Sequence, residues 1–555
     1  MSRNRNLIIY IILFSLLSIG LNAFSQENLT KEVKVVKPYE PTISDANKIS
    51  YLPKISDTIK VVPEVNYLLQ TKPINVGYTI NPIKPARMVS EPLIKLYNSY
   101  FRVGVGTKTL PLLEAYINSK RSEDYSVGAY YKYSASYAKV ELLNDERVFA
   151  GYSDNNLQLF GKKFFKNSTL QGDIGVQGDT RYFYGYDTQI DTSMDKDDIR
   201  QKYLQFNMNA NYKSTYVDSN HINYDFIVGI DYVKDDFSNN ELGFKMKGDI
   251  NKIFSKEMVG AKVGIEHYSV SENVDSSNNT IININPWVGK FGDKWRVKAG
   301  INFYSDIRED NTNTYYYPVG LLEYDVANHF LIPYAGVNGK IEVNNFLKTI
   351  SINPFIVPGQ SMLNTDHKLI LYGGIRGNFN STTYYNFKVS YSLIDNMPFF
   401  INNWALTDSI GNQFSVIYDN IELVSYFGEL SLAPNEKLNL HIKANYRNYK
   451  MDVEQKPWHK PSFDLTFSAR YNLRDKIILK GDIFSLGKRY AKLNNNVDFA
   501  ELESVIDINF GAEYRYSKIL SGFIQLNNIL SENYYQWNYY PTYGFNVLIG
   551  ITYAF

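Results

Sequence analysis

The sequence predicts an all-β protein, a transmembrane antiparallel β-barrel of about 22 strands that follows a short Pro-rich N-terminal periplasmic arm. Three observations predict this fold class. The chain begins with an export signal, no later apolar run is long enough for a membrane helix, and apolar and polar residues alternate from Tyr100 to the last residue. The predicted organisation is a signal peptide at 1–25, the arm or lumen-occluding segment at 26–99, and an outer-membrane barrel at 100–555.

The composition excludes several classes of protein. The chain of 555 residues has 58 Lys and Arg against 57 Asp and Glu, so its net charge is +1 and no global field attracts nucleic acid. It contains no cysteine, which excludes disulfides, thiolate metal sites and attachment through a lipoprotein cysteine. Because the net charge is close to zero, nucleic acid is not a predicted partner.

The first 25 residues have the pattern of a secretory signal peptide. Arg3 and Arg5 precede an apolar run from Leu7 to Leu21, and Ala23 and Ser25 are the small residues that signal peptidase requires at −3 and −1. The apolar run is shorter than the roughly 20 residues that span a bilayer. We expect cleavage after Ser25, with an uncleaved anchor as the alternative.

The next segment is interrupted by proline. Eight of the 19 prolines lie between Asn28 and Ser99, at Pro38, Pro41, Pro53, Pro63, Pro73, Pro82, Pro85 and Pro92. Because proline lacks a backbone donor and biases its predecessor toward extended conformations, we expect short extended pieces in place of helices or a central sheet. The alternatives are an arm docked on the barrel and a plain disordered linker.

From Tyr100 onward the side chains alternate with a period of two. In one predicted strand Leu204, Phe206, Met208, Ala210 and Tyr212 alternate with Gln205, Asn207, Asn209, Asn211 and Lys213. This period places the two sets on opposite faces of a sheet. Many of these runs are ten residues or longer and begin or end on tyrosine, which suits a membrane interface.

The chemistry of the two faces distinguishes a membrane barrel from a soluble β-sandwich. The apolar face is suited to outer-membrane lipids, whereas the charged and amide residues of the other face suit a water-filled or plugged lumen. We therefore predict the outer membrane of a Gram-negative cell as the location, with a soluble all-β protein as the alternative. The longer polar connections, 187–198 and 396–412, are the predicted surface loops.

The final strand has the sharpest alternation in the chain. Its predicted outward row ends on an aromatic C-terminus and consists of Tyr543, Phe545, Val547, Ile549, Ile551, Tyr553 and Phe555. An edge strand of this kind has the pattern of an outer-membrane targeting signal. We expect these residues to be recognised by the barrel-assembly machinery during insertion.

The last thirty or so residues carry a resemblance to a known family. The residues are Leu526, Asn527, Asn528, Ile529, Leu530, Tyr534, Tyr535, Trp537, Tyr540, Pro541, Gly544, Tyr553, Ala554 and Phe555. This stretch resembles the final hairpin of TonB-dependent outer-membrane receptors, which close a 22-stranded barrel around an N-terminal plug. The chain departs from that pattern because residues 26–99 are too few for the family's plug and show no plug-like signature.

A short segment of the arm resembles a TonB box, an extended stretch that adds a strand to TonB. It consists of Glu32, Val33, Lys34, Val35 and Val36. The resemblance implies contact with TonB. The alternative is an extended stretch that docks in the mouth of the barrel.

No catalytic chemistry is predicted. The six histidines have no metal-pair spacing, and we expect them at the surface or in the lumen; they are His221, His267, His329, His367, His441 and His459. Nucleophile-elbow, Walker and zinc-protease motifs are absent from the sequence. We therefore predict neither an enzyme nor a cofactor.

One acidic loop is a weak candidate for a metal site. Asp191, Asp195, Asp197 and Asp198 offer oxygen ligands of the kind that Ca²⁺ prefers, although their spacing does not match an EF-hand. A solvated acidic loop without metal is the favoured interpretation.

Two functions are predicted from these features. The first is a receptor or transporter for a nutrient too large for porins, with TonB or a surface lipoprotein as partner. The second is a non-transporting barrel, a subunit or scaffold of an outer-membrane assembly or secretion complex. A passive pore is less favoured because the arm is well placed to occlude the lumen.

Overall fold

The computed structural model of the protein describes residues 97–108, 111–189, 195–216, 221–271, 278–308, 311–404, 410–493 and 498–555. The segments predicted as signal peptide, TonB-contact segment and most of the arm lie outside these residues. Among the described helices, none is long and apolar enough to cross a membrane.

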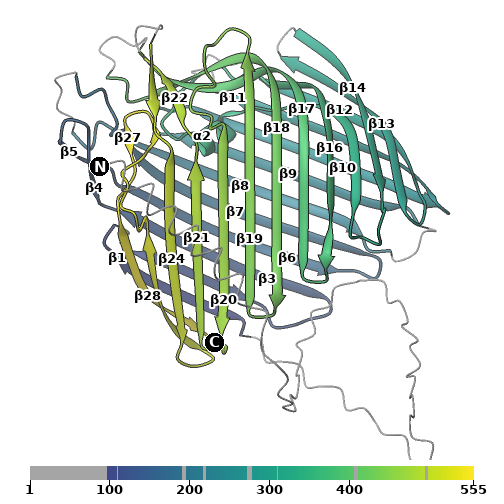
Figure 1. Ribbon diagram of the computed structural model, residues 1–555, viewed down its shortest axis with the longest axis horizontal. Coiled ribbons are helices and arrows are strands. Elements are labelled where there is room, and N and C mark those ends of the chain that lie inside the picture. Colours follow the sequence, from purple (N-terminus) through teal and green to yellow (C-terminus); the bar gives the residue numbers. More distant parts are fainter. Residues whose placement is uncertain are drawn as a thin grey trace, which may run out of the picture. The chain divides into compact units, whose positions relative to one another are not determined.

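Within the described residues, 22 strands form one antiparallel sheet that closes into a barrel (Figure 1). Strands that follow one another along the sheet's wall are hydrogen-bonded neighbours, and β1 pairs with β28 to close the ring, with Val103 opposite Ile551. Closure gives every barrel strand a hydrogen-bonded neighbour on both sides over at least part of its length, which is the condition for a sheet in lipid. The predicted fold class and strand number are confirmed.

The barrel strands and the elements between them have the following bounds: β1 (Ser99–Gly106), β2 (Leu112–Asn118), β3 (Tyr125–Ser136), β4 (Lys139–Glu141), β5 (Arg147–Phe149), β6 (Tyr152–Phe164), β7 (Ser168–Tyr182), β8 (Arg200–Ser214), β9 (Asn223–Asp235), β10 (Asn240–Phe254), β11 (Glu257–Val270), β12 (Asn279–Phe291), β13 (Trp295–Arg308), β14 (Asn311–Tyr324), β15 (Ile332–Glu342), α2 (Phe346–Ile352), β16 (Thr365–Asn380), β17 (Thr383–Asn402), β18 (Phe414–Asn435), β19 (Leu438–Met451), β20 (Phe463–Leu473), β21 (Ile477–Leu486), β22 (Arg489–Lys492), β23 (Phe499–Leu502), β24 (Val505–Arg515), β25 (Leu520–Asn527), β26 (Tyr535–Trp537), β27 (Tyr540–Pro541) and β28 (Asn546–Ala554).

The two faces of the wall have opposite chemistry, as the alternation predicts. Large apolar side chains lie exposed on the outside, for example Leu204 at 52% and Ile549 at 55% exposure. The inner face carries ion pairs between neighbouring strands, namely Arg102–Glu114, Arg181–Asp154, Lys245–Asp231 and Lys247–Glu266. A closed barrel with an apolar outer band and a polar interior belongs in an outer membrane, because only lipid makes that outer band favourable.

The two ends of the barrel differ in the length of their connections. At the end where Ser99 N–H donates to the Phe555 carbonyl at 3.0 Å, turns are short. One of them is the three-residue turn between Leu473 and Ile477, which has Arg474 and Asp475 at positive φ and is closed by a bond from the Lys476 N–H to the Leu473 carbonyl at 3.1 Å. Long connections gather at the opposite end, where Figure 1 shows α2, β22 and β27. Short turns mark the periplasmic end and long loops the extracellular end.

The wall is uneven in height. β17 has 20 residues and β18 has 22, whereas β1 has 8 and β28 has 9. The predicted loop 396–412 is therefore wrong in its first part, because residues up to Asn402 continue β17. Phe399 and Phe400 are buried there against the extracellular connections. This packing keeps the chain in strand conformation, although the polar residues of 396–412 suggested a loop.

The upper part of β15 leaves the wall. β14 and β15 pair only from Gly320 to Glu323 and from Tyr334 to Val337, and a register shift follows at Asn338. Beyond it β15 pairs with β16 alone, while the Asn302 side chain on β13 donates to the Gly339 carbonyl at 2.6 Å. The end of β15 thus lies over the inner face of β13, which brings its last residues into the lumen.

Candidate functional site

The extracellular mouth is covered by connections that fold onto one another. We call them the cap; it consists of residues 343–364, 403–413, 452–462 and 528–545, with 405–409 outside the described part. Segments from distant parts of the sequence meet in it. The cap is the candidate functional site because its connections pack together at the extracellular end of the barrel.

Aromatic rings form the interior of the cap. Tyr540, 1% exposed, stacks on Phe355 with ring centroids 4.0 Å apart. Trp537 lies 5.6 Å from Phe414 and 5.2 Å from Phe400 by ring centroids. Such rings contribute large apolar area together with specific geometry, so the cap has a hydrophobic core of its own.

Hydrogen bonds tie this core to the wall. The Tyr184 hydroxyl, beyond β7, donates to the Pro541 carbonyl at 2.9 Å, and the Tyr203 hydroxyl on β8 donates to the Pro354 carbonyl at 2.7 Å. The Tyr540 hydroxyl donates to the Asn412 carbonyl. The tyrosines of the final hairpin therefore contribute both ring packing and a polar tip.

The helix α2 is anchored on β10 by a carboxylate. Glu241 on β10 accepts the Phe346 N–H at 2.9 Å and the Asn345 side-chain amide at 2.8 Å, and the Leu347 N–H lies at 3.4 Å. Bonds to an ionised acceptor are stronger than neutral ones, and the first N–H groups of a helix have no acceptor within the helix itself. The connection between β15 and β16 thus reaches β10, which is not a neighbour of either strand.

His459 is a buried part of the cap, 7% exposed. Its Nδ1 lies 2.8 Å from the Phe400 carbonyl, and Asn538 N–H donates to its Nε2 at 3.3 Å, which together define a neutral imidazole. Burial lowers the pKa of His459 to about 4. The expectation that all six histidines lie at the surface or in the lumen is therefore wrong for this one.

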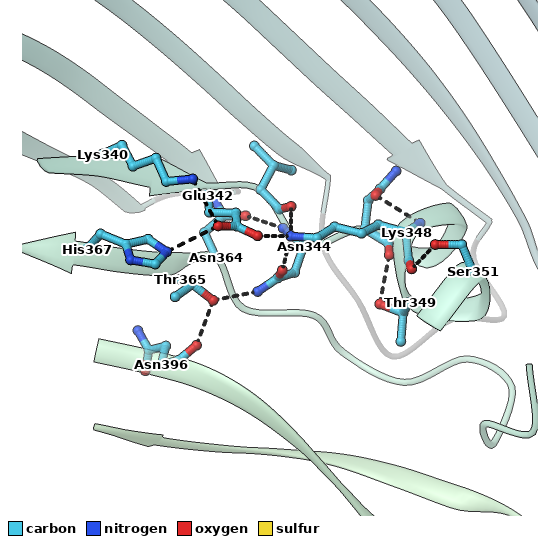
Figure 2. Close-up of polar contacts among 12 residues, drawn as sticks. Lys340, Glu342, Asn344, Lys348, Thr349, Ser351, Asn364, Thr365, His367 and Asn396 are labelled. Carbon is cyan, nitrogen blue, oxygen red and sulfur yellow. Dashed lines mark hydrogen bonds and ion pairs between the residues drawn. The ribbon is translucent and has the colours of Figure 1, made fainter. Parts of the chain in front are cut away.

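A basic cluster lies on the lumen side of the cap, and Figure 2 shows its side chains pointing toward one another. The Glu342 carboxylate at the end of β15 contacts three basic groups. Lys348 Nζ of α2 lies at 2.6 Å, Lys340 Nζ at 3.1 Å and His367 Nε2 at 3.1 Å. Asn344 joins the network as an acceptor for Lys348 at 2.8 Å. Sequence reasoning missed this cluster.

Below the cap the lumen is polar and hollowed. A cavity of about 660 Å³ lies toward the periplasmic end of the wall, and its lining includes Trp287, Arg296, Lys298, Glu323 and Arg376. Lys298 Nζ lies 4.1 Å from the centroid of the Trp287 ring, and Arg376 pairs with Glu323 at 2.7 Å. A wall that combines an aromatic surface with charges is suited to a polar solute.

The residues of the predicted targeting strand do not all lie in one strand. Val547, Ile549, Ile551 and Tyr553 lie in β28 with Phe555 just beyond it, whereas Tyr543 and Phe545 precede the strand. The Tyr543 hydroxyl donates to the Ala150 carbonyl in the neighbouring loop. Their role in targeting stays a prediction.

The acidic loop is only partly described, because Asp191 lies outside the described residues. Asp197 pairs with Arg200 at 3.1 Å, and the Asp197 N–H donates to Asp195 Oδ1 at 2.9 Å. Across the described residues, no three acidic or histidine side chains are placed to hold a metal ion. The proposed calcium site has no support from these contacts.

Comparison with known proteins gives the fold. No protein-family model and no curated protein sequence matches the chain. Among solved structures, the FrpB iron transporter from Neisseria meningitidis (F3-3 variant) is similar with a TM-score of 0.64 and 11% identity, over 83% of this chain and 82% of that one. The siderophore receptor PirA from Acinetobacter baumannii has a TM-score of 0.62 and 9% identity, over 82% and 80%.

A third similar structure is the ferripyoverdine receptor of the outer membrane of Pseudomonas aeruginosa. Its TM-score is 0.59 at 11% identity, over 83% of this chain and 72% of that one. The resemblance of the final hairpin to TonB-dependent receptors is thus confirmed at the level of the barrel fold. At these identities the similarity carries no information on substrate.

Proposed function

We propose that the protein is a gated uptake barrel of the outer membrane, which admits a nutrient too large for porins, and that the cap is its gate. The single observation that carries this proposal is the reach of residues 343–364 to strands on both sides of β15. They are bonded to the Tyr203 hydroxyl on β8, to Glu241 on β10 and to the Val416 N–H on β18. A barrel of 22 strands is wide enough to need a closure. The similarity of the barrel to an iron transporter and to a siderophore receptor supports an uptake role.

The proposal includes coupling to TonB through residues 32–36. Adding an extended segment as a strand is a known mode of recognition, and the segment has the required β-branched residues. Capture of the full-length protein by the purified periplasmic domain of TonB tests it. Deletion of 32–36 should abolish capture, while deletion of an equal length elsewhere in the arm should preserve it.

Locking the gate tests uptake itself, and the cysteine-free chain makes this practicable. In a variant with Glu241→Cys and Asn345→Cys, a short bifunctional methanethiosulfonate should bridge the cap to β10, because the native side chains lie 2.8 Å apart. Spent medium from a deletion strain carrying wild type, either single-cysteine control or the bridged variant is compared by mass spectrometry. The nutrient should be depleted by wild type and controls, and by the bridged variant only after reduction.

Depletion by the bridged variant without reductant would refute gating by the cap.

A second function, a scaffold subunit of an outer-membrane assembly, is favoured by one specific observation. Within the described residues, β14 has no strand partner from Asn311 to Val319 on the side facing β15. Such an edge accepts an added strand. Identical media from wild-type and deletion strains, together with co-purified secretion components, would support this function.

A further inference from the structure

Three basic groups contact one carboxylate beneath the cap, and a fourth responds to its charge. Glu342 contacts Lys340, His367 and Lys348, as Figure 2 shows. Lys460, from the connection after β19, is close enough for the charge of Glu342 to raise its pKa. These residues come from β15, β16, α2 and residues 452–462. Only the folded barrel brings them together.

The hydrogen bonds within the cluster are unequally distributed. Lys348 Nζ has three acceptors, which are Glu342 at 2.6 Å, the Val343 carbonyl at 3.1 Å and Asn344 at 2.8 Å. Lys460 Nζ has no hydrogen-bond acceptor or ion-pair partner among the described residues. Its amino group therefore retains three unused donors.

Positive charge exceeds negative charge at this position. Arg447 also acts on Lys460 by its charge but is paired with Asp464, so Glu342 is the carboxylate that pairs with Lys340 and Lys348 and attracts Lys460. Burial and the charges of Lys348 and Arg447 lower the pKa of Lys460, and Glu342 opposes that effect. A dianion at this position would satisfy more of these donors than a single carboxylate does.

We propose that Lys340, Lys348, Lys460 and His367 bind an anionic group of the transported ligand, a phosphate or a carboxylate, in exchange for the carboxylate of Glu342. This inference rests on the proposed function, because it names the chemistry of what the gate admits. The cluster faces the lumen, so a solute and not a lipid headgroup is the ligand.

The exchange has a consequence for the gate. Lys348 belongs to α2, and its bond to Glu342 ties this helix to β15, while Glu241 ties the start of the helix to β10. When the ligand anion binds Lys348 in place of Glu342, the bond between α2 and β15 is broken. The bonds to Glu241 then remain as the tether that opening of the cap has to break.

Anion binding by the full-length protein in nanodiscs tests the inference, with pyrophosphate and citrate as the probes and sucrose as a neutral control. Calorimetry should show binding of both anions to wild type. Lys460→Gln should weaken this binding about tenfold, since one unpaired cation is lost, whereas Lys460→Arg should retain it. Glu342→Gln should tighten it, because the competing carboxylate is neutralised. Lys443→Gln, a lumen lysine on β19 outside the cluster, is the matched control.

Opposite effects of Lys460→Gln and Glu342→Gln on pyrophosphate affinity would establish the site, since a merely structural cluster gives no such pair. Equal affinities in wild type, Lys460→Gln and Lys443→Gln, or no heat with either anion, would overturn it. The binding assay involves no uptake, so its failure leaves the gate-locking result standing. Conversely, failure of gate locking would leave a measured anion site without a transport role.

Discussion

The anchor of α2 on β10 can be tested by Glu241→Gln. Glu241 accepts N–H bonds at 2.9 and 2.8 Å and a weaker one at 3.4 Å. Bonds to a charged group contribute about 1.5–3 kcal/mol each. The glutamine keeps one acceptor oxygen and turns its own N–H₂ toward the remaining donors, so we expect a loss of about 3 kcal/mol from cap docking. Each 1.4 kcal/mol is a factor of ten, so the open population should rise about a hundredfold.

Hydrogen–deuterium exchange of residues 343–364 measures this population directly, because exchange in a locally opening segment follows its opening free energy. Glu114→Gln is the matched control, since Glu114 pairs with Arg102 in the lumen and does not touch the cap. Exchange in the barrel strands should be unchanged in both variants. Less than a threefold acceleration in Glu241→Gln, or equal acceleration in the control, would refute the anchoring role.

Three further predictions follow from the cap and the barrel wall. Trp537→Ala should cost the cap about 3–5 kcal/mol through lost ring packing, and planar-bilayer recordings should show larger or more frequent open-channel currents than wild type. Acid should loosen the cap: the folded pKa of His459 is about 4, below its ordinary value of about 6.5, so the stabilisation is present above pH 6.5 and is lost as pH falls toward 4. This amounts to about 3 kcal/mol and should appear as a change in tryptophan fluorescence that His459→Gln abolishes. Ile549→Lys, on the lipid face of β28, should destabilise the barrel by up to about 2–4 kcal/mol in urea titrations, whereas the lumen-facing change Lys443→Gln should have little effect.

The barrel could be predicted because its signal is local. Leu204, Phe206 and Met208 alternate with amides over a single strand, and the structure places them on the outside. Each strand repeats the same rule independently of its partners. The strand number followed from a count of the alternating runs and the even number that single-chain barrels favour, and closure through β1 and β28 follows from the need to leave no edge in lipid.

The cap could be predicted only in part. Trp537 and Tyr540 were singled out as members of a receptor-like hairpin, but their place in an aromatic core depends on Phe355 and Phe414 from other connections. His459 gave no local signal, because its partners Phe400 and Asn538 are distant in sequence.

The sequence by itself predicted an export signal, and it determined the two-faced strands and the chemistry of each face, because these depend on residues one or two positions apart. The tertiary structure decided which connections meet over the mouth, where β15 departs from β14, and which basic groups surround Glu342. Those outcomes depend on the circumference and uneven height of the closed barrel. Residues more than a hundred positions apart, such as Glu241 and Phe346, become neighbours only when the ring is complete.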